Sequence, residues 1–308
     1  MPTRLLIDTD PGVDDALAIL MAHAHADVAG LTIAAGNVGL VHTVGNALKL
    51  LELIDAPTPV FPGCAAPLVR AADDAAFVHG ADGFGDTGYL PAARRAADEH
   101  AALAIVRLAR VHEGALTLVA MAPLTNLALA LKLDPALPQR VARLVIMGGA
   151  VTGRGNTGRV AAEFNIAFDP EAAHVVFSAW PRFTLVDWEL TTRHGIAFAT
   201  MARWLAADDP RARFFAALSR KTRAWTEARG RPRLLVADAL AMAVALAPEI
   251  VQGAETRHVA VELDGALSRG ATVVDWDGRL GRPANAEIVT AVDQVRFEAL
   301  VAAALGAG

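Results

Sequence analysis

The sequence predicts a single α/β domain, residues 1–308, with an open, mostly parallel, doubly wound sheet of the Rossmann type. Up to residue 190, short apolar runs of strand length alternate with helical patterns. Parallel strands need crossover connections of this kind, most often helices. No internal repeat or low-complexity linker interrupts the chain. We therefore expect one domain with extra helices and a small C-terminal segment that contains strands.

The first elements of this domain are the most distinct. Residues 5–7 form an apolar run typical of a buried strand. Pro11 then holds Asp10 extended, Gly12 allows a sharp turn, and a helix begins at Asp14. The same reasoning predicts strands at 30–35, 60–61, 115–120, 143–147 and 183–186 and helices at 43–54, 99–110 and 124–133. Residues 62–98 have no clear period, and so long a segment in a compact protein is usually functional or disordered.

The second half opens with a strong helix start at Asp169, Pro170 and Glu171. These residues supply an N-cap acid, a proline at the first helical position and an acid in the first turn. The chain up to residue 246 is then mostly helical in pattern. Strand-like runs at 257–263, 271–275 and 286–292 precede a final helix.

The composition excludes several classes of protein. With 54% hydrophobic and 20% charged residues, the chain can bury a substantial core. Its net charge of −5 argues against nucleic acid or an anionic membrane as a partner. The single cysteine, Cys64, excludes a disulfide framework and a cysteine-based zinc site. Because we see no leader peptide and no apolar run of membrane-spanning length, we expect a soluble cytoplasmic protein.

Four carboxylates crowd the turn after the first strand, at Asp8, Asp10, Asp14 and Asp15. Like charges this close repel, so either some protonate or a cation holds them together. A helix N-terminus stabilises an acid by only ~0.3–1 kcal/mol, and N-capping would explain one or two aspartates. Calcium takes about 6–8 oxygen ligands, largely carboxylates and carbonyls. We therefore expect a metal site at this turn.

Several distant residues are expected to join this turn in one crevice. Each follows an apolar strand-like run, and the carboxyl ends of such strands converge in an open α/β sheet. These residues are Asp10, Asn37, Met121, Met147 and Glu189.

The stretch Asp-Thr-Asp-Pro-Gly-Val-Asp-Asp-Ala at 8–16 resembles the signature of the nucleoside hydrolases, the inosine–uridine-preferring family that releases a free base from a ribonucleoside. Further segments resemble blocks of that family in the same order, at 35–38, 123–128, 147–149, 163–165, 169–173, 269–275 and 281–286. Because the matching blocks extend over essentially the whole chain, the resemblance is specific. It implies the fold predicted above and a homodimer or homotetramer.

The resemblance also implies roles for individual residues. Calcium would be bound by Asp10, Asp15, Asp238 and the backbone carbonyl of Met121, together with the 2′- and 3′-hydroxyls of ribose. Asp10 would also act as general base for a water bound to the ion, which attacks directly, and Asn37 would position that water and the ribose. The remaining substrate-binding residues would be Asp14 and Asn165 at the ribose hydroxyls, and Asn156, Glu163 and the Met147 backbone at the 5′ end. Asp8 is left to orient the turn.

The sequence departs from the family pattern on the base side of the site. In the best-known members a histidine protonates the departing base, but Ala237 stands at that place. The candidates for base contact are His79, which lies in a glycine-rich loop, and Trp225 and Trp188. For Trp225, packing in the core is the competing interpretation. The base preference and the group that activates the leaving base stay open.

Two other functions compete with nucleoside hydrolysis. Ala237 is compatible with a nucleoside- or ribose-binding protein that has lost catalysis, although retention of all the expected metal ligands argues against it. A phosphohydrolase of the haloacid-dehalogenase type also opens with paired aspartates after its first strand. The sequence shows no later lysine and double aspartate that such an enzyme would need.

Overall fold

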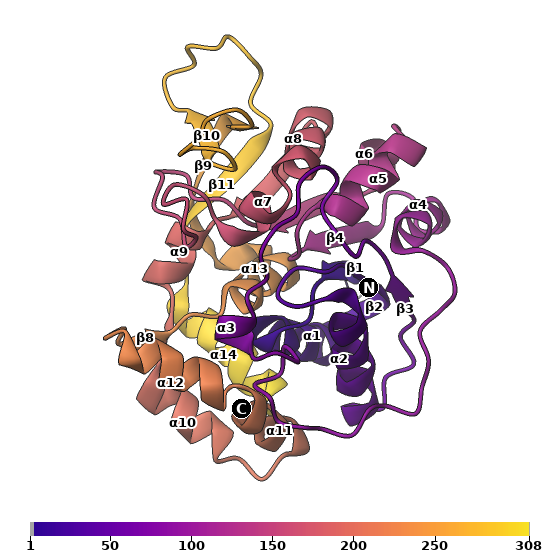
Figure 1. Ribbon diagram of the computed structural model, residues 1–308, viewed down its shortest axis with the longest axis vertical. Coiled ribbons are helices and arrows are strands. Elements are labelled where there is room, and N and C mark those ends of the chain that lie inside the picture. The colour runs from indigo at the N-terminus through magenta and orange to yellow at the C-terminus, as the bar shows by residue number, and fades with distance from the viewer. Residues whose placement is uncertain (1–2, 308) are drawn as a thin grey trace.

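A computed structural model describes residues 3–307 as an α/β domain around a nine-stranded sheet (Figure 1). Its strands are β1 (Arg4–Thr9), β2 (Asp27–Ile33), β3 (Val60–Pro62), β4 (Leu116–Ala120), β5 (Arg143–Met147), β6 (Phe183–Val186), β9 (Val251–Val261), β10 (Thr272–Asp275) and β11 (Ala286–Val292). They follow the order β10-β9-β11-β6-β5-β4-β1-β2-β3. From β3 to β11 all neighbours are parallel, whereas β9 runs antiparallel to both β11 and β10. The predicted fold class is therefore confirmed.

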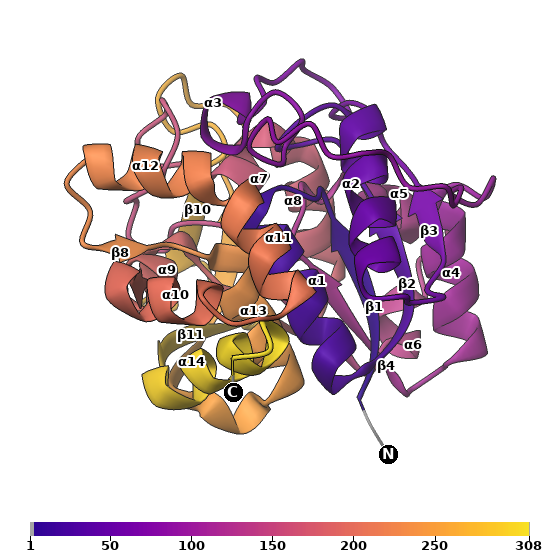
Figure 2. The same ribbon diagram turned by 90° about the horizontal axis from the view of Figure 1, so that it is seen from below.

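Helices cover both faces of this sheet, as Figure 2 shows for α1 and α2 on one side of the strands and α4 on the other. One face carries α1 (Val13–His25), α2 (Leu40–Leu53), α11 (Pro210–Leu218), α13 (Ala237–Leu246) and α14 (Gln294–Ala304). The other face carries α4 (Ala101–Val111), α5 (Thr125–Leu133) and α8 (Pro170–Ala179). Leu5 and Ile7 of β1 enter the first core and Leu6 enters the second. This alternation explains the continuous apolar run, since a strand covered on both faces needs apolar side chains on both.

Short elements complete the fold between these layers. They are α3 (Ala76–His79), α6 (Leu137–Arg140), α7 (Phe164–Phe168), α9 (Trp188–Arg193), β7 (Ile196–Ala197), α10 (Phe198–Leu205), α12 (Arg220–Ala228), β8 (Arg233–Leu234) and η1 (Pro248–Ile250). Strands β7 and β8 pair as a separate two-stranded sheet. Within residues 3–307 no helix is both long and apolar enough to cross a membrane.

The structure corrects some predicted boundaries. Strand β9 begins at Val251, six residues before the predicted start at 257, because its first half alternates exposed and half-buried residues and lacks a buried apolar run. The long segment 62–98 contains one short helix, α3. Too few residues form that helix for a periodic pattern to be visible in the sequence.

The sheet order also locates the crevice. From β1 the chain proceeds through β2 to β3 on one side, and β4, β5 and β6 lie on the other side. The order therefore reverses between β1 and β4, which is the switch point where open α/β sheets bind ligands. Helix α1 begins just past the carboxyl end of β1, so the acidic turn lies at this point.

Candidate active site

Asp15 is the most tightly held of the acids in this turn. It lies in the first turn of α1 and is fully buried. Its carboxylate accepts hydrogen bonds from the Gly12 N–H at 3.0 Å, from the Asn37 side-chain amide at 2.9 Å and from the Thr9 hydroxyl. These donors stabilise the charged form and fix the orientation of the carboxylate.

Asp10 keeps one carboxylate oxygen free. Its Oδ2 accepts the Asn37 backbone N–H at 2.7 Å, and the Asn37 side-chain amide donates to the Asp10 carbonyl at 3.1 Å. The other oxygen, Oδ1, is buried without a hydrogen-bond partner among residues 3–307. Burial, followed by the charge of Asp15, raises the pKa of Asp10 well above its usual range. A buried carboxylate oxygen of this kind calls for a cation or a proton donor from outside the protein.

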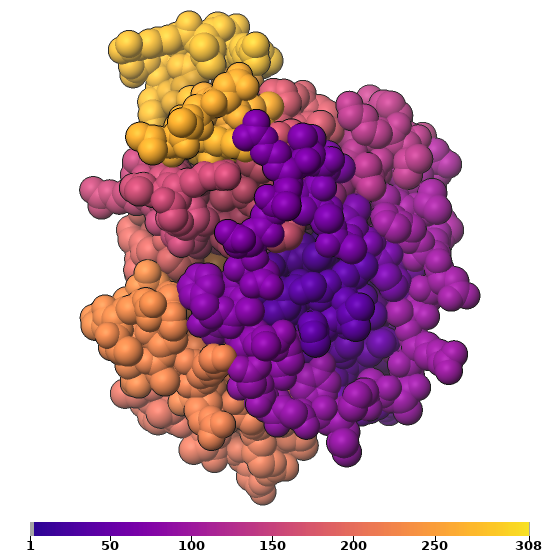
Figure 3. Space-filling model, in the orientation of Figure 1, coloured from indigo at the N-terminus to yellow at the C-terminus, as the bar shows by residue number. Residues whose placement is uncertain are grey.

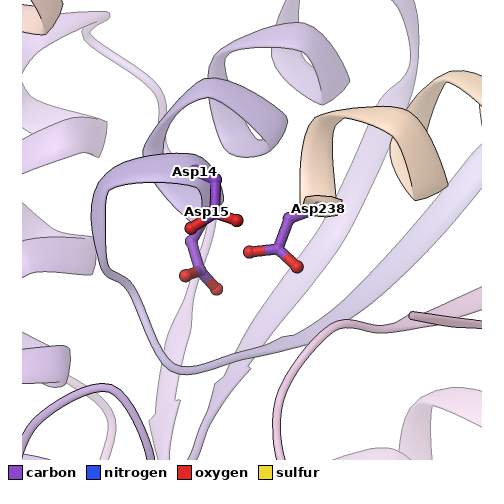
Figure 4. Close-up of side chains that lie close together, drawn as sticks. All are labelled: Asp14, Asp15 and Asp238. Atoms are coloured by element: carbon purple, nitrogen blue, oxygen red, sulfur yellow. The ribbon is translucent and has the colours of Figure 1, made fainter. Parts of the chain in front are cut away.

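Asp238 completes the acidic cluster from far along the chain. It lies in the first turn of α13, a helix that packs against α1. One carboxylate oxygen each from Asp14, Asp15 and Asp238 lies within 4.8 Å of the others, and the three side chains point toward one another (Figure 4). Asp10 is not one of these three, although its charge acts on Asp238, whose pKa burial and the neighbouring acids raise well above its usual range.

Such a cluster fits a hard divalent cation. Carboxylates this close destabilise each other unless positive charge or protons offset their repulsion. The available donors are all oxygens, which is the ligand set that calcium and magnesium prefer. The free Oδ1 of Asp10 beside this group supplies a further oxygen.

Asp8 lies outside this cluster, and its Oδ2 is buried without a hydrogen-bond partner among residues 3–307. Its Oδ1 accepts hydrogen bonds from the Thr32 hydroxyl at 2.7 Å and the Asn126 side-chain amide at 2.9 Å. These contacts join β1 to β2 and to α5. Burial raises the pKa of Asp8 to about 6.

Asn165 joins the ends of β4 and β5 at the pocket. Its side-chain amide donates to the Met121 carbonyl at 2.8 Å and to the Met147 carbonyl at 3.3 Å. A carbonyl oxygen has two lone pairs, so the Met121 oxygen keeps one that could face an ion.

Two glutamates shape the loops around Asn165. Glu163 caps α7 and accepts hydrogen bonds from the N–H groups of Gly149, Asn165 and Ile166, while burial raises its pKa to about 7. Glu189 accepts hydrogen bonds from the Thr152 N–H at 2.8 Å, the Thr152 hydroxyl at 2.6 Å and the Arg154 N–H at 3.2 Å. Glu189 thus anchors the loop that carries Asn156.

One pocket brings most of the predicted residues together. It is lined by Asp14, Asn37, His79, Met121, Met147, Asn156, Glu163, Asn165, Trp225 and Asp238. Asp10 and Asp15 are nearly or fully buried and are not among the lining residues. In Figure 3 the violet segment that contains α3 lies between the orange helical segment and the indigo N-terminal region.

His79 is held against the start of α1. Its Nδ1 accepts the Val13 N–H at 3.1 Å, which places the proton of the neutral ring on Nε2. Burial lowers the pKa of His79 to about 4. The imidazole is therefore neutral near pH 7, and its Nε2–H is its only donor.

The pocket lining also contains two residues that the sequence did not indicate, Phe77 and Arg231. Phe77 of α3 and Arg231 line the pocket, together with Trp188 and Trp225, both half-buried. The Phe77 and Trp225 rings lie 6.1 Å apart and tilted. Ala237 also lines the pocket. A periodic pattern could not identify Phe77 or Arg231, because both lie in short, irregular segments.

Comparison with known proteins assigns the family. The sequence model described as inosine-uridine preferring nucleoside hydrolase matches residues 5–299. The chain belongs to this family. It is therefore a nucleoside hydrolase, as the resemblance implied, and the haloacid-dehalogenase alternative is wrong.

Individual relatives of this nucleoside hydrolase differ in their named preferences. The non-specific ribonucleoside hydrolase RihC of Salmonella enteritidis is 37% identical over 97% of this chain and 96% of its own length. The pyrimidine-specific ribonucleoside hydrolase RihB of Escherichia coli is 34% identical over 97% of this chain and 95% of its own. A solved inosine-guanosine nucleoside hydrolase superposes with a TM-score of 0.93 at 35% identity, covering 99% of both chains.

Proposed function

We propose that this chain hydrolyses the N-glycosidic bond of ribonucleosides with calcium as its cofactor, releasing the free base and ribose. The observation that carries the proposal is the convergence of Asp14, Asp15 and Asp238 at the pocket of a nucleoside hydrolase, with Asp10 near enough for its charge to act on Asp238. We assign the ion to Asp10, Asp15, Asp238 and the Met121 carbonyl. When bound, the ion supplies positive charge that balances the carboxylates and makes a neighbouring water more acidic.

Asp10 acts as the general base. Its Oδ1 is free to accept a proton, whereas its Oδ2 is held by the Asn37 N–H. Asn37 thus fixes the carboxylate and faces the pocket beside it. The water oxygen forms a bond to C1′ of the ribose, Asp10 takes the proton, and the bonding pair of the glycosidic bond departs with the base.

The remaining polar residues hold the sugar. Asp14 and Asn165 bind the ribose hydroxyls, while Glu163, Asn156 and the Met147 backbone bind the 5′ end. Asp14 also provides negative charge that stabilises the positive charge developing on the ribose. The structural support is that all five residues line one pocket.

The deciding experiment measures free ribose released from inosine, guanosine, adenosine, uridine and cytidine, with calcium and with a chelator. We expect release from at least one nucleoside, its loss with chelator and its recovery with calcium ahead of magnesium or zinc. No release from any nucleoside, together with measurable nucleoside binding, would instead support the binding-protein alternative.

We also propose that the protein is a homodimer or homotetramer, as the family resemblance implies. Light scattering of the purified protein measures the mass of the assembly directly. A mass equal to the 32.2 kDa of one chain would contradict this proposal.

A further inference from the structure

Arg231 is a charged residue in the pocket wall that has no carboxylate or carbonyl partner among residues 3–307. It lies in the connection between α12 and β8 and is half-buried. Its guanidinium carbon lies 5.7 Å from the ring centre of Trp188 and 5.8 Å from that of Trp225, and all three residues line the pocket. Among residues 3–307 its guanidinium has these two cation–π contacts but no hydrogen bond or ion pair.

The half-buried guanidinium of Arg231 has N–H donors that face no acceptor in the described part of the protein and can serve a ligand in the pocket. A guanidinium presents five N–H donors in a planar fork and no acceptor. Burial and the neighbouring charge of Arg229 both disfavour the cation. Arg229 itself is exposed, packs over Trp225 at 3.8 Å and does not line the pocket. Of the two arginines, Arg231 is therefore the one whose donors are available to a ligand in the pocket.

We propose that Arg231 binds the base of the substrate and makes this enzyme select 6-oxopurine nucleosides, inosine and guanosine, over adenosine. This inference rests on the proposed function and adds the substrate class. A flat base fits a wall formed by Trp188, Trp225 and Phe77, since aromatic rings stack on one another. The hydrogen-bonding groups on the edge of the base that faces Arg231 then determine which purine binds better.

The discrimination follows from the hydrogen-bonding groups of the two kinds of purine. Hypoxanthine and guanine carry the acceptors O6 and N7 side by side, the pattern that an arginine fork binds in a bidentate manner. Adenine presents N7 beside an amino group, which is a donor and opposes the guanidinium. Such a bidentate pair discriminates by about 1–3 kcal/mol, which is roughly 5- to 150-fold in relative affinity.

The same contact assists departure of the base. When the C1′–N9 bond breaks, its electron pair stays on the purine, and the negative charge spreads onto O6 and the ring nitrogens. A cation already in place stabilises this charge in the transition state. The water oxygen bonds to C1′, Asp10 takes its proton, and the purine anion takes a proton from solvent. Arg231 thus supplies leaving-group stabilisation that Ala237 cannot provide.

The test compares Arg231→Met with wild type by kcat/KM for inosine, guanosine and adenosine. We expect wild type to prefer the two 6-oxopurine nucleosides. In the variant their kcat/KM should fall by roughly 10- to 100-fold, mainly through kcat, with adenosine changed by less than about threefold. Arg231→Lys, which keeps the charge but not the fork, should recover only part of the loss.

Two controls separate base binding from other effects. Arg229→Met removes the neighbouring cation and should keep the wild-type preference. Hydrolysis of p-nitrophenyl riboside, whose nitrophenolate leaves as a stable anion, should persist in Arg231→Met and show that the fold and the sugar site are intact.

Several results would overturn the inference while leaving the proposed function in place. These are equal losses on inosine and adenosine, the same selectivity change in Arg229→Met, or an equal loss on p-nitrophenyl riboside. Absence of ribose release by wild type from every nucleoside is a different result, because it contradicts the proposed function itself.

Discussion

Asp10 differs from the other acids of the cluster in the freedom of one oxygen. Asp15 has donors on both oxygens, whereas Asp10 has its Asn37 contact on Oδ2 and nothing on Oδ1. Asp8, two residues earlier, also has one buried oxygen without a partner among residues 3–307, Oδ2, but its Oδ1 is held by Thr32 and Asn126, and it lies outside the cluster. The division of roles among these aspartates thus rests on hydrogen bonds, which their spacing in the sequence does not show.

Replacing Asp10 with asparagine should nearly abolish turnover and keep the fold. The side chain retains its size and can still accept the Asn37 N–H, but it no longer takes a proton. Loss of a general base typically reduces the rate by about 10²–10⁴-fold. Because one charge leaves the crowded cluster, the metal-free variant should melt at the same temperature as wild type or higher. Steady-state ribose release and thermal melting measure the two effects.

Asp8→Asn is the matched control for this substitution. It removes a buried carboxylate at the same strand end, but its Oδ1 can still accept from Thr32 and Asn126. We expect most of the activity to remain. Full activity of Asp10→Asn would contradict the role of Asp10 as general base. Equal inactivity of Asp8→Asn and Asp10→Asn would also contradict it.

At the scale of elements, the turn between β1 and α1 depends on close approach. Gly12 has φ −107°, a conformation open to other residues. A Cβ atom there would lie 2.6 Å from His79 Nδ1 and 2.8 Å from Asn37 Nδ2. Glycine is needed because α3 and the end of β2 meet α1 at this point. The sequence predicted a turn here, and the contact that requires glycine belongs to the tertiary structure.

Gly12→Ala should lower both stability and activity. Overpacking a well-filled site costs about 1–3 kcal/mol, and the shift of Asn37 would release the Asp10 carboxylate. Chemical denaturation and kcat/KM are the measurements.

Gly39→Ala is the matched control for Gly12→Ala. Gly39 precedes α2 with φ −61°, and a Cβ atom there would have no neighbour within 4 Å. It should change neither stability nor activity appreciably. Equal stability and equal activity of the two variants would show that His79 and Asn37 do not pack closely against residue 12.

For the whole molecule, the acidic cluster makes the stability of the fold depend on pH and on a bound metal ion. Burial and mutual repulsion raise the pKa of Asp10 and Asp238 in the folded, metal-free protein, whereas the ordinary value is 3.8. The folded protein therefore binds more protons than the unfolded chain, and this stabilising contribution is lost as pH rises above that value. A cation that replaces those protons binds more tightly as pH rises.

Removal of calcium should therefore lower the melting temperature more at about pH 8 than at about pH 5. At a calcium concentration one hundred times the Kd, binding adds about 2.7 kcal/mol to the stability. Scanning fluorimetry with calcium and with a chelator across this pH range measures the difference. A chelator effect that is absent, or larger at low pH, would contradict a calcium site at these carboxylates. Asp238→Asn should reduce the response to calcium.

The α/β class and the metal hypothesis could both be predicted from the sequence. Buried parallel strands need apolar side chains on both faces, and four aspartates in one turn need an explanation, so both features are visible in a local stretch. Elements β1, α1 and α8 could also be predicted from the sequence, because the residues that indicate them are close together in the chain. Strand β9 and helix α3 were less visible, since one is half-exposed and the other is a single turn.

The residues that meet in the site could be identified only from the folded chain. Asp238 reaches Asp14 and Asp15 because α13 packs on α1, and the sheet order places the ends of β1, β4 and β5 in one crevice. The base side of the pocket, with Arg231 beside Trp188 and Trp225, comes from irregular segments. Contacts between segments far apart in the chain depend on packing, and no local pattern encodes them.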